Sequence, residues 1–206
     1  KGTSLILIET NQGDEPIQKL TSELNNQKLT LTRLLVEGSA AVALAVVFSI
    51  LGKFTAVPFK ISLSMVPLIL FAFRTGSAYS LLVSFTYSIF NMLSDGAPVH
   101  IGSVFFDYIL PFTLLGSVFL LKKVVQDISF KSYLIVFFAV LILCVQRFLF
   151  HTLSGALYFG SSKKSFSQNL VFSLIYNTKY LWLTSIATVY LVIAFFKPLI
   201  SKEKII

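Results

Sequence analysis

The stretch YLIVFFAVLILCVQRFLFHTLSGALYF, residues 133–159, decides the fold class of this chain. It is apolar along nearly its whole length, and it exceeds the roughly 20 residues that an α-helix needs to cross a bilayer. It also contains Arg147 and His151, which are four residues apart and therefore share one helical face. Polar side chains at such positions usually face a cavity, because exposing a charge to lipid is costly. The stretch predicts a membrane-spanning helix with a polar inner face.

The composition of the whole chain agrees with this interpretation. Hydrophobic residues make up 55% of the 206 residues and charged residues 13%, whereas soluble domains have about 45–50% and about 25%. The formal net charge is +8, but the basic residues stand singly or in pairs between apolar runs. This distribution favours orientation in a membrane over nucleic-acid binding. The single cysteine, Cys144, excludes an intrachain disulfide and a cysteine-rich metal site.

The chain divides into a polar extension, residues 1–30, and a membrane domain, residues 31–206. We interpret the extension as cytoplasmic, either a weakly ordered tail or an interfacial helix. The rest holds six apolar segments, at about 31–51, 61–73, 78–93, 101–121, 133–159 and 170–196. The second segment is short and contains Pro67, so it is either shielded by its neighbours or only partly inserted. The prediction is an all-α integral membrane protein, a six-helix transmembrane bundle with a short second helix; five spans are the alternative.

Positive charge predicts the orientation of this bundle. With six segments both termini lie on one side of the membrane. Eleven lysines and arginines fall on that side: Lys1, Lys19, Lys28, Arg33, Arg74, Lys122, Lys123, Lys131, Lys197, Lys202 and Lys204. Four fall on the other side: Lys53, Lys60, Lys163 and Lys164. Because positively charged loops remain in the cytoplasm, we expect a multi-pass protein of the cell membrane with both termini cytoplasmic.

Several polar residues within the apolar segments are candidate site residues. Asp107 lies in the fourth segment, and Asn177 and Lys179 lie in the sixth. With His151 and the aromatic residues near the same segment ends, they suit a flat ligand that is cationic or bears an amine. Three structural alternatives remain open: an Asp107–Arg147 ion pair that only fixes packing, a histidine that only links helices, and a Lys179 that extends to the surface.

Enzymatic functions find little support. The chain contains no G-x-x-x-x-G-K-[ST] loop, so it cannot supply its own ATP-hydrolysing site. His100 and His151 are the only histidines, and no nucleophile-elbow motif accompanies Ser154. We therefore predict neither an enzyme, nor a bound cofactor, nor a metal site.

Five short motifs resemble one known family in their order and spacing. They are RLLVEG (33–38), PLILFAFRTG (67–76), FDY (106–108), FLFH (148–151) followed by Ser154-Gly155, and SLIYN (173–177). Over residues 31 to 197 the chain resembles the substrate-binding S components of energy-coupling-factor (ECF) vitamin transporters, and it is most similar to the thiamine-specific S component.

The resemblance implies ligand-binding roles for individual residues. Asp107 takes the place of the acidic residue that hydrogen-bonds the aminopyrimidine of thiamine, and Tyr108 follows it as in the family's pair. His151 and Asn177 match ligand-contacting positions, and Arg147 matches a basic position one turn before the histidine.

At other positions the chain departs from the thiamine pattern. Phe159 stands where the family has a stacking tryptophan, and Phe172 where it has a ligand-contacting tyrosine. Asp107 is one methylene shorter than the family's glutamate. Thiamine, a thiamine precursor and a related pyrimidine therefore all remain open as the ligand.

The resemblance also implies partners. A family S component captures its vitamin outside the cell, and two ATPase subunits drive release through a membrane scaffold subunit. Ser39 and Ala43, four residues apart in the first segment, would allow the scaffold to approach closely. The alternative for this small-residue face is packing within the chain. The alternative for the whole protein is a stand-alone secondary transporter or a channel for a small polar solute.

Overall fold

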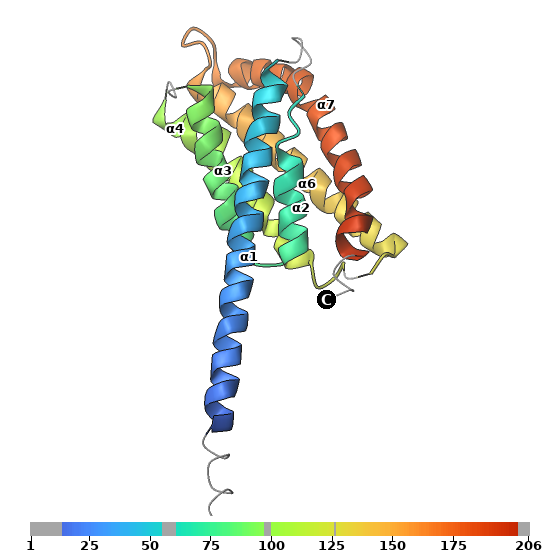
Figure 1. Cartoon of the computed structure of the whole chain (residues 1–206). Helices are drawn as coiled ribbons and strands as arrows, with labels where there is room; N and C mark the ends of the chain where they lie inside the picture. The colour runs from blue at the N-terminus through green and yellow to red at the C-terminus, as the bar shows by residue number, and fades with distance from the viewer. Residues whose placement is uncertain (1–13, 55–60, 97–99, 126, 202–206) are drawn as a thin grey trace, which may run out of the picture. The chain divides into compact units, whose positions relative to one another are not determined.

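The computed structural model describes residues 14–54, 61–96, 100–125 and 127–201, and these residues contain helices and connecting turns but no strand (Figure 1). Five longer helices are α1 (Asp14–Lys53), α2 (Met65–Thr75), α3 (Tyr79–Asp95), α6 (Phe130–Tyr158) and α7 (Phe166–Ser201). Between α3 and α6 lie four consecutive helical pieces: α4 (Ile101–Ser103), the π-helical η1 (Val104–Ile109), α5 (Leu110–Thr113) and the 3₁₀-helical η2 (Leu114–Leu121). The all-α prediction is confirmed. The described residues hold seven α-helices rather than six, because the predicted fourth segment changes its hydrogen-bonding pattern along its length.

The first helix is longer than its predicted apolar segment. Helical backbone begins at Asp14, within the residues interpreted as a polar extension, and continues to Lys53. Pro16 does not prevent this, because a proline in the first helical turn removes no intrahelical hydrogen bond. The chain falls into two compact units, Lys1–Glu37 and Gly38–Ile206. The following description concerns the second unit.

The short helix α2 is the most buried helix of this unit. Seven of its eleven residues are buried, and Leu68 and Ile69 are fully inaccessible. Phe73 packs edge-on against Phe196 of α7, with ring centroids 6.0 Å apart. The neighbouring helices therefore shield this segment, which accounts for a helix too short to cross a bilayer alone.

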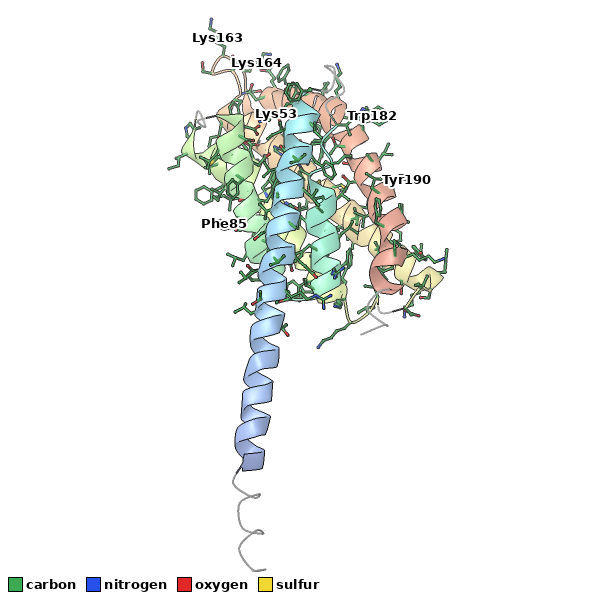
Figure 2. The ribbon with its side chains drawn as sticks, in the orientation of Figure 1. Lys53, Phe85, Lys163, Lys164, Trp182 and Tyr190 are labelled. Carbon is green, nitrogen blue, oxygen red and sulfur yellow. The ribbon has the colours of Figure 1, made fainter. Side chains whose placement is uncertain are left out.

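Four helical stretches are long and apolar enough to cross a membrane: Thr30–Lys53, Ile101–Leu121, Phe130–Tyr158 and Leu181–Pro198. Large apolar side chains cover their outer surfaces, including Leu120, which is 68% exposed, and Ile142, which is 65% exposed. Figure 2 shows Phe85 and Tyr190 on the outer faces of α3 and α7. Such apolar surfaces are stable in contact with lipid. The chain is therefore a multi-pass membrane protein.

Helix α7 differs from its predicted course. Figure 1 shows that its first part crosses the upper end of the unit and that the helix then turns and runs down beside α6. The membrane-spanning stretch of α7 accordingly begins only at Leu181. The polar residues of its first part thus lie over one end of the helices rather than along their sides.

Gly116 is required where η2 meets the start of α3. A Cβ atom at this position would lie 2.5 Å from the carbonyl oxygen of Ser80 and 2.7 Å from the Cα of Leu81. Both are backbone atoms, which cannot move aside as a side chain can.

Gly116→Ala should lower the thermal stability of the purified protein, at an overpacking cost of about 1–3 kcal/mol. The control is Leu120→Ala on the lipid-facing side of the same helical segment, which creates no close contact. Thermal unfolding in detergent measures both variants. Equal stability of Gly116→Ala and the wild type would contradict the close approach.

Candidate functional site

The polar residues of η1 and α6 form one chain of hydrogen bonds. Arg147 Nε donates to His151 Nε2 at 3.3 Å, and His151 Nδ1 lies 2.9 Å from Asp107 Oδ1. Ser154 Oγ donates to the other carboxylate oxygen, Asp107 Oδ2, at 2.6 Å. Arg147, His151 and Ser154 can all take part because their spacing places them on one face of α6. We call this set, Arg147–His151–Asp107–Ser154, the Asp107 relay.

The relay defines what each group can still offer to a ligand. A histidine that accepts at Nε2 and donates from Nδ1 is neutral, and both of its nitrogens are occupied. His151 can therefore present only its ring face. Each Asp107 oxygen accepts one bond within the protein and retains a further lone pair, so the carboxylate can still accept hydrogen bonds from a ligand.

The relay also bears on the structural alternatives. Asp107 bonds directly to His151 and Ser154, and Arg147 reaches it only through the histidine. The Asp107–Arg147 ion pair considered from the sequence is thus replaced by an Asp107–His151 pair, with side chains 17% and 18% exposed. His151 does link two helical segments. Lys179 is exposed, as expected for a side chain that extends to the surface.

Asp107 lies in an irregular part of its helix. Residues Val104–Ile109 form a π-helical stretch, in which the backbone hydrogen bonds span five residues instead of four and so widen the helix. Such stretches occur frequently at functional sites because they displace side chains from the regular helical positions.

An aromatic cavity of about 420 Å³ lies on one side of the relay, between α6 and the first part of α7. Its lining residues are Asp107, His151, Gly155, Phe159, Phe172, Ser173, Tyr176 and Asn177. Asn177 Nδ2 donates to both the backbone oxygen and the hydroxyl of Ser173, at 3.0 and 3.1 Å. Among the described residues its Oδ1 has no partner, so this cavity presents hydrogen-bond acceptors from Asp107 and Asn177 between aromatic rings.

Gly155 lies at a close contact between α6 and the first part of α7. A Cβ there would collide with the hydroxyl of Ser173, so the glycine allows α6 and α7 to approach closely. Ser173 Oγ in turn donates to the backbone oxygen of Thr152 at 2.8 Å. Gly155 therefore leaves room for α7, and it also lines the aromatic cavity.

A polar cavity of about 550 Å³ lies on the other side of the relay. Its lining residues are Ser49, Gly52, Lys53, Ser62, Ser64, Tyr87, Asn91, Ser94, Asp95, Asp107, Tyr108, Phe112, Arg147 and His151. Asn91 Oδ1 accepts from Ser49 Oγ at 2.6 Å and from Tyr87 Oη at 3.1 Å, which joins α1 to α3.

The two cavities divide the predicted ligand-binding residues between them. Asp107 and His151 border both cavities. Phe159, Phe172 and Asn177 line the aromatic cavity, whereas Tyr108 and Arg147 line the polar one.

Sequence reasoning missed the α1 and α3 walls of the polar cavity. Ser49 and Asn91 are polar residues inside apolar segments, as Asp107 is, and the same argument applied to uncharged side chains would have identified them.

A third hollow, of about 630 Å³, runs between α1 and α3. It is lined by Gly38, Ser39, Val42, Ala43, Val46, Val47, Tyr79, Leu82, Val83, Thr86 and Phe90. Ser39 and Ala43 are exposed, whereas Gly38, Ala41 and Ala45 are buried. The small residues of α1 therefore serve two faces. Gly38, Ala41 and Ala45 pack within the chain, and Ser39 and Ala43 border a groove.

Comparison with known proteins gives consistent results. Residues 35–204 match the family model described as thiamine transporter protein (Thia_YuaJ). The thiamine transporter ThiT of Bacillus subtilis (strain 168) is 29% identical over 172 residues, which cover 76% of this chain and 85% of that protein. The solved structure of ThiT from Listeria monocytogenes superposes with a TM-score of 0.66 at 20% identity, covering 81% of this chain and 94% of that one.

These matches show which family the chain belongs to. The structural likeness shows a ThiT-like fold, and the family model spans most of the sequence, including every residue of the relay. The resemblance to a thiamine-type S component is confirmed, and the family is one of transporters, not of enzymes. The chain belongs to the thiamine transporter protein family.

Proposed function

We propose that this protein is the substrate-binding S component of an ECF-type transporter and that it captures thiamine or a thiamine-related compound outside the cell. Family membership supports the transport of a thiamine-like molecule. The observation that carries the proposal is the Asp107 carboxylate, which His151 and Ser154 hold at the wall of an aromatic cavity.

The chemistry of the aromatic cavity fits such a ligand. Thiamine contains an aminopyrimidine, whose amino group can donate to Asp107 and to Asn177 Oδ1. It also contains a cationic ring, which the faces of Phe159 and Phe172 would attract. In the structure a cation of the protein itself lies over one of these rings: Lys164 Nζ is 5.5 Å from the centroid of the Phe172 ring. A bound cationic ring would take the place of this ammonium group.

The proposed topology is a bundle of six membrane segments with both termini in the cytoplasm. In this arrangement α4, η1, α5 and η2 together form one crossing, Ile101–Leu121. Figure 2 shows Lys53, Lys163 and Lys164 at the same end of the unit Gly38–Ile206. These are three of the four basic residues assigned to the outer side. Phe159 and Phe172 border that end of α6 and α7, so the aromatic cavity would open to the outside.

The proposed partners are a membrane scaffold subunit and two ATPase subunits. The groove that Ser39 and Ala43 border supports docking of a scaffold helix, because small side chains allow close helix contact. The sequence lacks an ATP-binding loop of its own, which agrees with ATP hydrolysis by other chains.

Asp107→Asn should weaken thiamine binding about 10- to 150-fold, because it removes a charge-assisted hydrogen bond worth about 1.5–3 kcal/mol. The fold should persist, since an asparagine can still bond to His151 and Ser154. Isothermal titration and thermal unfolding of the purified variant measure the two effects.

A matched control is Asp127→Asn, the same chemical change near the start of α6, where Asp127 accepts a hydrogen bond from Ser132. It should leave thiamine affinity unchanged. If Asp107→Asn lowered stability and left the dissociation constant unaltered, Asp107 would be a packing residue and the proposed ligand contact would be wrong.

A cysteine at position 162 tests the orientation. Ser162→Cys should react with a membrane-impermeant thiol reagent in intact cells, because the loop 160–164 is assigned to the outside. The native Cys144 is buried and adds little background. Val124→Cys, next to Lys122 and Lys123, should react only after the membrane is opened. The reverse pattern of labelling would overturn the topology.

Ala43→Leu tests the groove between α1 and α3. A bulky side chain should hold a scaffold helix away, so transport should fall while ligand affinity stays nearly unchanged. Ala40→Leu, also exposed on α1 but outside the residues that line the groove, is the control. Uptake assays and titration of the purified variants decide between outcomes. An equal loss of binding and transport would assign this face to packing within the chain.

A further inference from the structure

We propose that one end of the membrane domain binds an anionic phospholipid, whose headgroup contacts the exposed lysines Lys123, Lys131 and Lys197 and whose acyl chain lies along α6. We call these three lysines the basic face. It lies at the end of the unit Gly38–Ile206 opposite the connection between α6 and α7 (Figure 1). The inference goes beyond the proposed function, because it involves neither of the cavities beside the Asp107 relay.

Aromatic contacts hold the helix ends of this region together. Phe196, near the end of α7, packs edge-on against Phe73 of α2 and Tyr133 of α6, with ring centroids 6.0 and 5.6 Å apart. Lys197 directly follows Phe196, and Lys131 lies two residues before Tyr133. The rings therefore bring lysines from α6 and α7 to the same end of the unit.

The connection between η2 and α6 is held in place at the same end. Lys122 Nζ donates to the backbone oxygen of Arg74, near the end of α2. Ser132 Oγ of α6 donates to Asp127 Oδ1 at 2.9 Å. These two contacts attach the connection to α2 and to α6, and they leave the neighbouring Lys123 exposed.

Positive charge outweighs negative charge in this region. Five basic residues of the unit lie here: Arg74, Lys122, Lys123, Lys131 and Lys197. Asp127 is the one carboxylate that the described residues of the unit place at this end, and it already accepts a hydrogen bond from Ser132. Within the described part of the chain no carboxylate pairs with a lysine of the basic face. The face therefore offers three ammonium groups to an anion.

The apolar surface beside the basic face identifies the occupant as a lipid. Phe130, next to Lys131, is 79% exposed. It begins a stripe of exposed apolar side chains that are three or four residues apart and so share one face of α6. The stripe consists of Phe130, Leu134, Phe138, Ile142, Val145 and Leu149. It runs from the lysines along the membrane-spanning helix, so an acyl chain can follow it while the headgroup stays at the basic face.

The charge of the basic face selects among phospholipids. A phosphatidylcholine headgroup carries a quaternary ammonium beside its phosphate, and the lysines repel this cation. A phosphatidylglycerol headgroup carries no cation, so its negative charge is uncompensated. Each basic residue near a membrane surface strengthens the attraction to anionic lipid by about fivefold. This attraction is short-ranged in salt, so it acts on the lipid that lies against the lysines.

Tryptophan fluorescence can measure which lipid lies at the basic face. Phe130→Trp, made together with Trp182→Phe, places the only tryptophan of the chain beside Lys131. The purified full chain is reconstituted in vesicles of phosphatidylcholine and phosphatidylglycerol, in which one lipid or the other is brominated and quenches the tryptophan on contact. The two quenching curves give the ratio of the association constants, which should favour phosphatidylglycerol about 5- to 25-fold.

Paired charge removals test whether the lysines cause this preference. Lys123→Gln combined with Lys131→Gln removes two charges from the basic face and should bring the ratio close to one. The matched control is Lys163→Gln combined with Lys164→Gln, which removes two charges at the opposite end of the unit (Figure 2). The control should leave the ratio unchanged.

A second measurement needs no tryptophan probe. In detergent micelles, phosphatidylglycerol should raise the thermal midpoint of the wild type more than phosphatidylcholine does, and the Lys123→Gln, Lys131→Gln variant should lose this difference. Soluble glycerol phosphate at the same concentration should have no effect, because it lacks acyl chains.

Two results would overturn the proposal. Stabilisation by glycerol phosphate equal to that by the lipid would assign the basic face to a free anion. A preference for phosphatidylglycerol that survives removal of Lys123 and Lys131 would assign these lysines to another partner, such as an acidic protein surface.

Discussion

The hydrogen bond between His151 and Asp107 is the interaction on which the rest of the structure depends. A carboxylate and a guanidinium placed inside a membrane domain are each costly, and here the His151 ring lies between them and hydrogen-bonds to both. The bridge joins η1 to α6, and its Asp107 and His151 border both the aromatic and the polar cavity. The same three side chains thereby fix the packing of two helical segments and the chemical character of both cavities.

The sequence predicts much of this arrangement. The apolar run 133–159 corresponds to α6, and 101–121 coincides with the crossing that begins at Ile101. Asp107, Arg147 and His151 could be identified because charged or titratable residues inside apolar segments face interiors for a simple energetic reason. Order and spacing of the surrounding motifs then predicted the family, which the family model confirms.

Other features depend on tertiary structure that no local pattern encodes. The π-helical stretch at Val104–Ile109 leaves no clear mark in an apolar sequence, and neither does the turn in α7, because both arise from packing. Both His151 nitrogens are occupied, by Arg147 and by Asp107. The sequence could not predict this, because it depends on how η1 packs against α6. The contribution of Ser49 and Asn91 to the polar cavity was not predicted. Uncharged polar residues are common in membrane helices, so they are a weaker signal than a charged residue. The start of α1 at Asp14 was not predicted either, because the residues there are polar and carry no apolar pattern that would indicate a helix.

The proposed function requires the chain to hold an amino-bearing heteroaromatic ligand of the thiamine class. Mass spectrometry of the small molecules that the purified protein releases on denaturation would identify this ligand. We expect thiamine or a compound containing its aminopyrimidine, present in the wild type and depleted in Asp107→Asn. Release of a ligand without an aminated aromatic ring, held equally by both proteins, would contradict it.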